Sequence, residues 1–425
     1  MRGIMCERNR RGWCVATGVA WSLWAAACAE PDDWELTEIA ADEQAELLVE
    51  ADEEEVEAPE RTREDDEQAE EDEAPERTPA ESVLTDSVTP TRALTLVGSI
   101  AAHVQANGSL DGGWCTGGTL SSVKLSPGRY QVICAGHGPA NANAQVVASG
   151  VGTTGKHCKL EGAPGGATVT VWTVRCHDAT GTVVDSAFKL IADHRSGTGD
   201  SGAYLTSSAT GTVTRSWNSA GMSNTVANPS AGVYAVTLNG LSGSNKAVHV
   251  TAIDNSANRC KVGNWGGSIV AVRCFDTAGT LTNTPFSLTF QTVSLLDEAG
   301  VGSTIGAHSW ISSGVVQPSW TQVLDACPGT PVPSLTATPT GAGGLDLELS
   351  LPEAEFAGGS EDNALPMVSG YGIGSSHCAI VSWEVDPAGT AETVIRCFDS
   401  AGAQVDASTT PFTFSISNKE TPGSC

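Results

Sequence analysis

One short motif recurs three times along the 425 residues of this chain, each time around a cysteine. Residues 174–178 read Val-Arg-Cys-His-Asp, residues 272–276 read Val-Arg-Cys-Phe-Asp and residues 395–399 read Ile-Arg-Cys-Phe-Asp. An earlier cysteine precedes each copy, at Cys158, Cys260 and Cys378. Units that recur at a spacing of about 100 residues are domains rather than the short repeats of a solenoid. The motif therefore predicts a tandem array of three modules.

The composition after residue 93 favours β-structure. Thr, Ser, Val, Gly and Ala dominate, and turn residues recur about every 8–12 positions, which is typical of a β-sandwich. In the second module Val270, Val272 and Cys274 fall on one face of a period-two strand, and Arg273 falls on the other. We therefore predict an all-β fold of three tandem disulfide-stapled β-sandwich modules, placed at residues 93–193, 203–291 and 300–418.

The N-terminus has the pattern of a secretory signal peptide. Residues 1–13 carry four arginines against one glutamate, and an apolar run at 14–27 follows. At about 14 residues, this run is shorter than the roughly 20 that a helix needs to cross a bilayer. We expect residues 1–27 to be a signal peptide and the chain to have no permanent transmembrane helix.

The end of this region, Ala25-Ala26-Ala27-Cys28, fits two kinds of cleavage. Three small residues directly before a cysteine resemble the bacterial lipoprotein signal, in which the cysteine is lipidated and becomes the mature N-terminus. The alternative is an ordinary A-x-A site formed by Ala25 and Ala27, which leaves Cys28 as a free or mispaired thiol. We expect lipidation at Cys28, so that the membrane is a partner of the chain through this lipid.

Residues 28–92 are predicted to be a disordered acidic tether that follows the lipid anchor. Asp and Glu dominate this segment, with 25 of them between Glu30 and Glu81 against three arginines. Too few apolar groups are present to offset the entropy of ordering, and self-repulsion keeps such a segment extended. A low-affinity Ca²⁺ sponge and a docking site for basic partners are the alternatives to a solvated tether.

The cysteines predict the disulfide map. With Cys6 and Cys14 in the signal peptide and Cys28 lipidated, an even number of the 13 cysteines remains, so all of them can pair. Each bond of the repeated motif should join Cα atoms about 4.4–6.8 Å apart and contribute roughly 3 kcal/mol. The last pair below would clip the tail, residues 419–425, to the third module. The predicted pairs are Cys158–Cys176, Cys260–Cys274, Cys378–Cys397, Cys115–Cys134 and Cys327–Cys425.

The repeated features resemble those of β-rich modules in exported proteins of actinobacteria and myxobacteria. The resemblance rests on Arg-Cys-Lys-Val at 259–262, Trp265, and Val-Arg-Cys-Phe-Asp-x-x-Gly at 272–279, and it covers most of residues 93–418. It departs at His177, where the other copies have phenylalanine, and in the long third module. The resemblance implies export and a β fold, and it carries no catalytic residue across.

One segment is similar to the nucleophile motif of trypsin-like serine proteases. Residues 199–202 read Gly-Asp-Ser-Gly, and His103 follows two alanines, as the histidine of those enzymes does. The triad needs a base, an orienting acid and an oxyanion hole on one scaffold. Ser201, however, falls in the joint after the first module, and the usual second glycine and proline are missing. We therefore expect no catalytic residue and no enzymatic activity.

Metal, cofactor and nucleic-acid sites are not indicated either. The eight histidines lack an H-x-x-H spacing, and the cysteines lack the C-x-x-C spacing of zinc sites. The Asp-x-x-Gly segment after each second cysteine reads as a tight turn rather than a metal site. No Gly-rich phosphate loop enters a helix, and a net charge of −28 opposes binding to nucleic acid.

The tryptophans fall into two groups. We expect Trp265 and Trp383, five residues after the first cysteine of their modules, to pack in the core beside the disulfide. The other group lies in Gly- and Ser-rich stretches, where the indoles are either core residues or exposed platforms for sugar rings or partner proteins. These possible binding aromatics are Trp114, Trp217, Trp310 and Trp320.

These features predict an exported, lipid-anchored, non-catalytic protein of the bacterial cell envelope. It would present a β-sandwich array at the outer membrane, at the cell surface or in the periplasm, for a structural role or to bind an unknown protein or glycan. The alternative is an ordinary secreted, extracellular protein with a hydrolase or carbohydrate-binding role. A deep polar pocket with a Ser/His or Asp/Glu pair would favour an enzyme, whereas an exposed aromatic strip would favour binding.

Overall fold

A computed structural model describes twelve stretches of the chain, and they contain β-strands, turns and no helix. The predicted signal peptide, the lipidation site Cys28, the acidic tether and residues 420–425 lie outside these stretches. The described residues are 98–115, 118–135, 143–162, 169–194, 202–242, 246–291, 304–317, 322–324, 334–340, 343–350, 364–385 and 390–419.

Eight strands form the first sandwich, which we call sandwich 1. They pair into two antiparallel sheets of order β2-β1-β8-β5 and β3-β4-β7-β6. The strands are β1 (Gly98–Val104), β2 (Leu110–Cys115), β3 (Thr119–Ser126), β4 (Arg129–Ala135), β5 (Asn143–Ser149), β6 (His157–Gly162), β7 (Val169–His177) and β8 (Ala187–His194).

Sandwich 2 has eight strands in the sheets β10-β9-β16-β13 and β11-β12-β15-β14. Its sheets are also antiparallel throughout. The strands are β9 (Gly202–Ser207), β10 (Val213–Asn218), β11 (Asn224–Ser230), β12 (Val233–Leu238), β13 (Ala247–Ala252), β14 (Arg259–Gly266), β15 (Ile269–Phe275) and β16 (Phe286–Gln291).

Sandwich 3 has the sheets β18-β17-β26-β22 and β20-β21-β24-β23, with β19 paired to β17 and β25 paired to β24. Its strands are β17 (Thr304–Ser312), β18 (Val315–Val316), β19 (Gln322–Leu324), β20 (Ser334–Pro339), β21 (Leu345–Ser350), β22 (Ala364–Gly370), β23 (His377–Val385), β24 (Thr390–Phe398), β25 (Gln404–Val405) and β26 (Phe412–Lys419).

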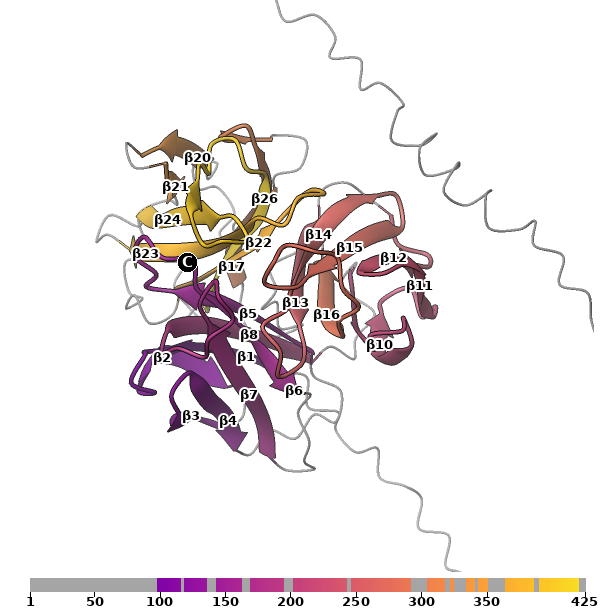
Figure 1. Cartoon of the computed structure of the whole chain (residues 1–425), viewed down its shortest axis with the longest axis horizontal. Helices are drawn as coiled ribbons and strands as arrows, with labels where there is room; N and C mark the ends of the chain where they lie inside the picture. The colour runs from indigo at the N-terminus through magenta and orange to yellow at the C-terminus, as the bar shows by residue number, and fades with distance from the viewer. Residues whose placement is uncertain are drawn as a thin grey trace, which may run out of the picture. The chain divides into compact units, whose positions relative to one another are not determined.

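The three sandwiches share one strand order. In each, the first, second, fifth and eighth main strands form one sheet in the order 2-1-8-5, and the other four form a sheet in the order 3-4-7-6. Sandwich 3 departs from this order only by the short additions β19 and β25 within its described strands. The colours of Figure 1 separate the three groups of strands: indigo to purple, pink, and orange to yellow.

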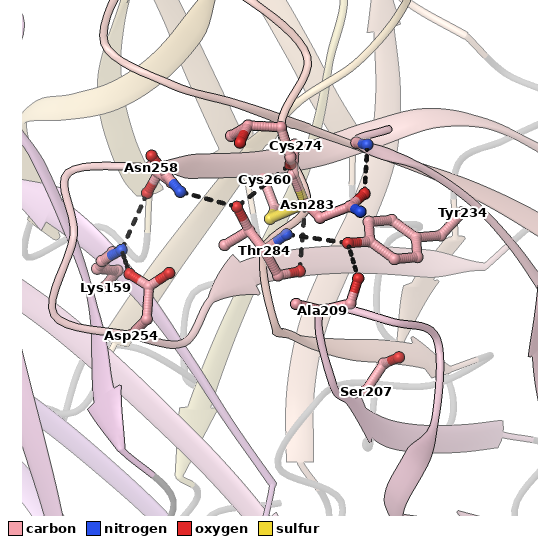
Figure 2. The surroundings of a disulfide bond; sticks show 12 residues. Lys159, Ser207, Ala209, Tyr234, Asp254, Asn258, Cys260, Cys274, Asn283 and Thr284 are labelled. Atoms are coloured by element: carbon pink, nitrogen blue, oxygen red, sulfur yellow. Dashed lines mark hydrogen bonds and ion pairs between the residues drawn. A yellow bond between two sulfur atoms is a disulfide. The ribbon is translucent and has the colours of Figure 1, made fainter. Parts of the chain in front are cut away.

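Alternating side chains build each core between two sheets. Val270, Val272 and Cys274 are fully buried on β15, which confirms the inward face predicted from the period of two. In sandwich 2 the rings of Tyr234 on β12 and Phe286 on β16 lie 4.9 Å apart and join the two sheets. The Tyr234 hydroxyl also donates to the Ala209 carbonyl at 2.9 Å (Figure 2).

Four disulfides lie among the described residues of the sandwiches. They join Cys115 to Cys134 and Cys158 to Cys176 in sandwich 1, Cys260 to Cys274 in sandwich 2, and Cys378 to Cys397 in sandwich 3. These are four of the five predicted pairs, and the fifth, Cys327–Cys425, lies outside the described residues. The described part of the chain is thus all-β, with three tandem disulfide-stapled β-sandwich modules.

In the three disulfides of the repeated motif, the Cα atoms lie closer together than the predicted range of about 4.4–6.8 Å. The distance is 4.0 Å in each of them. The reason is that the two cysteines face each other directly on adjacent antiparallel strands. In sandwich 2 the Cys274 N–H donates to the Gly232 carbonyl rather than to Cys260, so the two cysteines do not exchange backbone hydrogen bonds. In an antiparallel sheet, facing residues of this kind have the closest Cα atoms.

Candidate functional site

Each sandwich contacts the next through the strand that carries the first cysteine of the repeated motif. Side chains alternate along a strand, so residues on either side of an inward-pointing cysteine point away from its core. All of these outward residues are less than a tenth exposed, because another sandwich covers them. They are His157 and Lys159 on β6, Arg259 and Lys261 on β14, and His377 and Ala379 on β23.

Sandwich 1 contacts sandwich 2 through β6. Leu160 forms a parallel bridge with Ile253, and the Asp254 N–H donates to the Leu160 carbonyl at 3.1 Å. The Lys159 ammonium forms an ion pair with the Asp254 carboxylate and donates to the Asn258 carbonyl at 3.2 Å (Figure 2). Burial lowers the pKa of Lys159, and the Asp254 carboxylate opposes that shift.

Sandwich 2 contacts sandwich 3 in the same way through β14. Val262 forms a parallel bridge with Tyr371, and the Gly372 N–H donates to the Val262 carbonyl at 2.9 Å. The Lys261 ammonium donates to the Gly374 carbonyl at 3.0 Å. This lysine therefore meets backbone oxygen where Lys159 meets a carboxylate.

The difference changes the protonation of Lys261. Burial, followed by the nearby guanidinium groups of Arg259 and Arg273, lowers the pKa of Lys261 to about 7. The ammonium also donates to the carbonyl of Ser376 at 3.1 Å. A lysine held by carbonyl and hydroxyl oxygens, with no carboxylate beside it, has little to stabilise its charge, which is why its pKa falls so far.

Sandwich 3 contacts sandwich 1 through β23 and completes a cycle. The Ile380 carbonyl accepts from the Val151 N–H at 3.4 Å, and Arg396 Nη1 donates to the Gly152 carbonyl at 3.0 Å. Ala379 occupies the position that holds a lysine in the other two sandwiches. Each sandwich therefore uses the same strand to contact the next, in the order 1 to 2, 2 to 3 and 3 to 1.

The Asp-x-x-Gly turns form a second cycle of contacts. The predicted turn is confirmed: the Asp276 carboxylate accepts from the Thr280 N–H at 2.9 Å, and Gly279 has a φ of +80°. A Cβ on any of the three turn glycines would press on the following sandwich, at 2.4 Å from the Ala179 Cβ in the case of Gly402. The pairs are Gly181 with Thr277, Gly279 with Ser375 and Ser400, and Gly402 with Ala179.

Buried hydroxyl groups connect sandwich 2 to both neighbours. Ser287 Oγ donates to the Ala144 carbonyl of sandwich 1 at 2.7 Å, and Thr413 Oγ1 of sandwich 3 donates to the Val248 carbonyl at 2.6 Å. All of these atoms belong to the sheets that contain the fifth and eighth strands. Direct, buried hydrogen bonds therefore join the sandwiches.

His249 on β13 lies between two serines of sandwich 3. Its Nδ1 is 3.2 Å from Ser369 Oγ and its Nε2 is 2.8 Å from Ser415 Oγ. Burial, followed by the nearby His308, lowers the pKa of His249 to about 3. The imidazole is therefore neutral near pH 7 and acts as a link between two hydroxyl groups.

A cavity of about 60 Å³ lies where β6, β14 and β23 begin. Arg259 Nη1 lies 3.2 Å from His377 Nδ1, and the rings of His157 and His377 are 5.8 Å apart. Burial lowers the pKa of both histidines well below the usual value. The lining includes five basic residues from the three sandwiches and no Asp or Glu, the basic residues being His157, Lys159, Arg259, Lys261 and His377.

A second pocket, of about 270 Å³, is lined by residues of sandwiches 1 and 3, among them Ser149 and Trp383. His103 Nδ1 lies 3.2 Å from Asp111 Oδ2. Burial, followed by the nearby Lys189, lowers the pKa of His103 to about 4, against the opposing effect of Asp111. The Lys189 amine is fully buried and lies 3.5 Å from the centre of the Trp383 ring.

Of the two alternatives for the possible binding aromatics, burial fits the three that the structure describes better than an exposed platform does. Trp114 is only 8% exposed, because it packs into the apolar cluster of sandwich 3. Trp310 is half-buried, with its ring 6.3 Å from that of Trp265 and 5.3 Å from that of Tyr371. Trp217 is half-buried against the ring of Tyr204.

The remaining predicted positions divide as follows. Trp265 is in the core of sandwich 2, as predicted, whereas Trp383 is only partly buried and borders the second pocket. The possible platform Trp320 and the protease-like Ser201 lie outside the described residues, as does Cys28.

Sequence reasoning missed the basic cluster at the junction. His157, Arg259 and His377 all precede the first cysteine of their module, so their shared position is visible in the sequence. That position indicates only an outward-pointing side chain, and such residues are ordinarily solvated. The covering sandwich is what makes them a buried site.

Comparison of the chain with protein-family models, with curated proteins and with solved structures found no match. Within the described stretches, no helix is long and apolar enough to cross a membrane. Among the same residues, no three His, Cys, Asp or Glu side chains are grouped in a way that would hold a metal ion.

Proposed function

We propose that the chain is an exported, lipid-anchored protein of a bacterial cell envelope, whose folded region is a non-catalytic body for binding or for a structural role. The observation that carries the proposal is a disulfide at the same place in every sandwich. Structural disulfides persist in oxidising compartments outside the cytosol. The arginine-rich start, the apolar run and Ala25-Ala26-Ala27-Cys28 supply the matching export and lipidation signals.

The shared strand order supports treating the sandwiches as copies of one module. Each copy uses its β6-type strand and its Asp-x-x-Gly turn to contact the next. Such contacts hold the modules in a fixed arrangement, which suits a body that presents a surface at the end of a tether. This role requires no reaction centre.

Two of the buried histidines, His249 at the contact with sandwich 3 and His103 in the second pocket, are poor candidates for a general base, which supports a non-catalytic role. An effective base has a pKa near the working pH, whereas the pKa of His249 is about 3 and that of His103 is about 4. Ser149 lies on β5 and His103 on β1, with β8 between them. Ser149 Oγ has no hydrogen-bond partner among the described residues, so the serine and the histidine of this pocket are not paired.

The anchor is tested by replacing Cys28 with serine in the full chain, expressed in a bacterium that processes lipoproteins. The Cys28→Ser protein should leave the membrane fraction, and the mature wild-type N-terminus should carry a diacylglyceryl group. Cys14→Ser is the matched control, because that cysteine lies in the predicted signal peptide and should leave the anchor intact. Membrane retention of Cys28→Ser, or a mature N-terminus without lipid, would show that the anchor is assigned wrongly.

The non-catalytic role is tested separately with the purified chain. A panel of ester, peptide and glycoside substrates should remain uncleaved. A parallel screen against glycans and proteins would identify a ligand of a binding body. Turnover of any of these substrates that disappears in His103→Ala or His249→Ala would overturn the non-catalytic part of the proposal.

A further inference from the structure

The buried guanidinium of Arg259 is only partly paired. Its Nη1 donates to His377 Nδ1 at 3.2 Å, but Nε and Nη2 are both buried and have no hydrogen-bond partner among the described residues. Arg259 is 6% exposed, so water has little access to it. Because a buried charge is costly unless it is paired and hydrogen-bonded, this guanidinium lacks a compensating group.

The nearest carboxylates do not supply that group. Asp276 and Asp399 act on Arg259 only through the longer-range field, because their oxygens cap turn amides: Asp276 accepts from the Thr280 N–H and Asp399 from the Ala403 N–H, each at 2.9 Å. The cavity lining itself contains no Asp or Glu. The guanidinium therefore faces a cavity with no negative charge of its own.

The other cations around the cavity add to its excess of positive charge. The charge of Lys159 is compensated by Asp254, but Lys261 has only carbonyl and hydroxyl oxygens around its ammonium. Both lysines line the cavity beside Arg259. A buried cavity with two uncompensated basic groups attracts an anion, whose charge would stabilise both of them.

We propose that the cavity between the three sandwiches binds one small inorganic oxyanion, held by the Nε and Nη2 edge of Arg259. This edge presents two parallel N–H groups, the fork that receives phosphate and carboxylate groups in a bidentate manner. The site goes beyond the proposed function, because it is buried at the junction and does not depend on how the protein is anchored.

The histidines determine which oxyanion fits best. Arg259 donates to His377 Nδ1, so the neutral His377 ring carries its proton on Nε2, which is buried and unpartnered and becomes a third donor. His157 Nε2 faces the Ala257 carbonyl at 3.1 Å, so its proton is on Nε2 and its unpartnered Nδ1 is an acceptor. Three donors and one acceptor match hydrogen phosphate, which has a hydroxyl of its own, better than sulfate.

The size of the cavity sets a limit on the ligand. A volume of about 60 Å³ corresponds to the space of roughly four to six water molecules. Phosphate and sulfate have five heavy atoms each, whereas a nucleotide or a sugar phosphate is several times larger. The free inorganic ion matches this volume, whereas the larger part of a nucleotide or a sugar phosphate would have to lie outside the cavity.

The test is calorimetric titration of the full, disulfide-intact chain with sodium phosphate, after dialysis into a phosphate-free buffer of constant ionic strength. Phosphate should bind with a ratio of one per chain and raise the melting temperature, sulfate should bind more weakly, and chloride should not compete. Arg259→Lys keeps the charge but removes the fork, and it should weaken phosphate binding by about ten-fold or more.

The matched control is Arg129→Lys, because Arg129 is 39% exposed and pairs with Glu161 on the surface of sandwich 1. This variant should bind phosphate like the unmodified chain. Equal weakening in both variants, full affinity in Arg259→Lys, or absence of phosphate binding by the unmodified chain would overturn the proposal. Tighter binding of sulfate than of phosphate would refute the assignment of His157 Nδ1 as an acceptor.

A second measurement needs no variant and covers the case in which Arg259→Lys fails to fold. In nitrogen-15 NMR of the unmodified chain, phosphate should shift the Nε–H signal of Arg259 and slow its exchange with water. The Nε–H signal of Arg129 should stay in place. An Arg259 signal that does not respond to saturating phosphate would contradict the site even without a mutant.

Discussion

Placing a methyl group on the third Asp-x-x-Gly turn tests whether these turns lock the sandwiches together. The change is Gly402→Ala, at a glycine with a φ of +80°. The new Cβ would lie 2.4 Å from the Cβ of Ala179, which belongs to the equivalent turn of sandwich 1. Neither atom is at the end of a flexible side chain, so the backbone of one turn has to move.

The magnitude follows from two separable effects. An alanine forced to a positive φ costs about 1–2 kcal/mol, and overpacking a filled contact adds typically 1–3 kcal/mol. Gly402→Ala should therefore lower the free energy of unfolding by about 2–5 kcal/mol. Gly221→Ala is the control for the first effect, because Gly221 has a φ of +69° and no atom within 4 Å of its added Cβ. Its loss should be about 1–2 kcal/mol.

The assay is guanidinium unfolding of the disulfide-intact chain at 25 °C, followed by tryptophan fluorescence. The decisive comparison adds Ala179→Gly to Gly402→Ala, because this second change removes the atom that the new methyl group strikes. The double variant should recover the overpacking part, about 1–3 kcal/mol, and retain the cost of the positive φ. Equal losses in Gly402→Ala and Gly221→Ala, or no recovery in the double variant, would refute the packing of the turns against one another.

Two further predictions concern the disulfides and the buried histidines. Replacing both Cys260 and Cys274 by alanine should lower the free energy of unfolding by roughly 3 kcal/mol, and a measured loss below about 1 kcal/mol would contradict a stapling role for this bond. The pKa of His103 is about 4 and that of His249 is about 3, both below the unfolded value of about 6.5, so the unfolded chain binds more protons as the pH falls. Each of these histidines should then lower the free energy of unfolding by about 1.4 kcal/mol as the pH falls from 7.5 to 5.5. Chemical unfolding in phosphate-free buffer measures this loss. A free energy of unfolding that does not change with pH would show that the rings are not buried in the neutral form.

The strands could be predicted from the sequence because each depends on local chemistry. The period of two that places Val270, Val272 and Cys274 inward operates within one strand. The repeated Cys260–Cys274 spacing needs only two neighbouring strands in register. The shorter Cα distance was missed because the spacing of cysteines does not reveal which pairs of facing residues exchange backbone hydrogen bonds.

The junction could not be predicted, because it depends on how whole sandwiches meet. A lysine such as Lys261, next to an inward cysteine, looks like any solvated outward residue, and only the strand of the next sandwich makes it buried. Trp114 was open to both interpretations for the same reason, since its Gly-rich setting does not show that sandwich 3 covers it. The sequence defines one module well and leaves the surface between modules undetermined.

The cyclic order of contacts fixes the number of modules at three. In an open string of domains, the last one always has an unused contact surface, and a further copy can be added there without disturbing the rest. Here the β23 surface of the third module is already occupied by the first, through Ile380 and Val151. Head-to-tail contacts that close on themselves leave no free end, so a fourth copy would have to break an existing contact before it could make its own. Adding a copy of the module to this protein should therefore destabilise the three that are already joined.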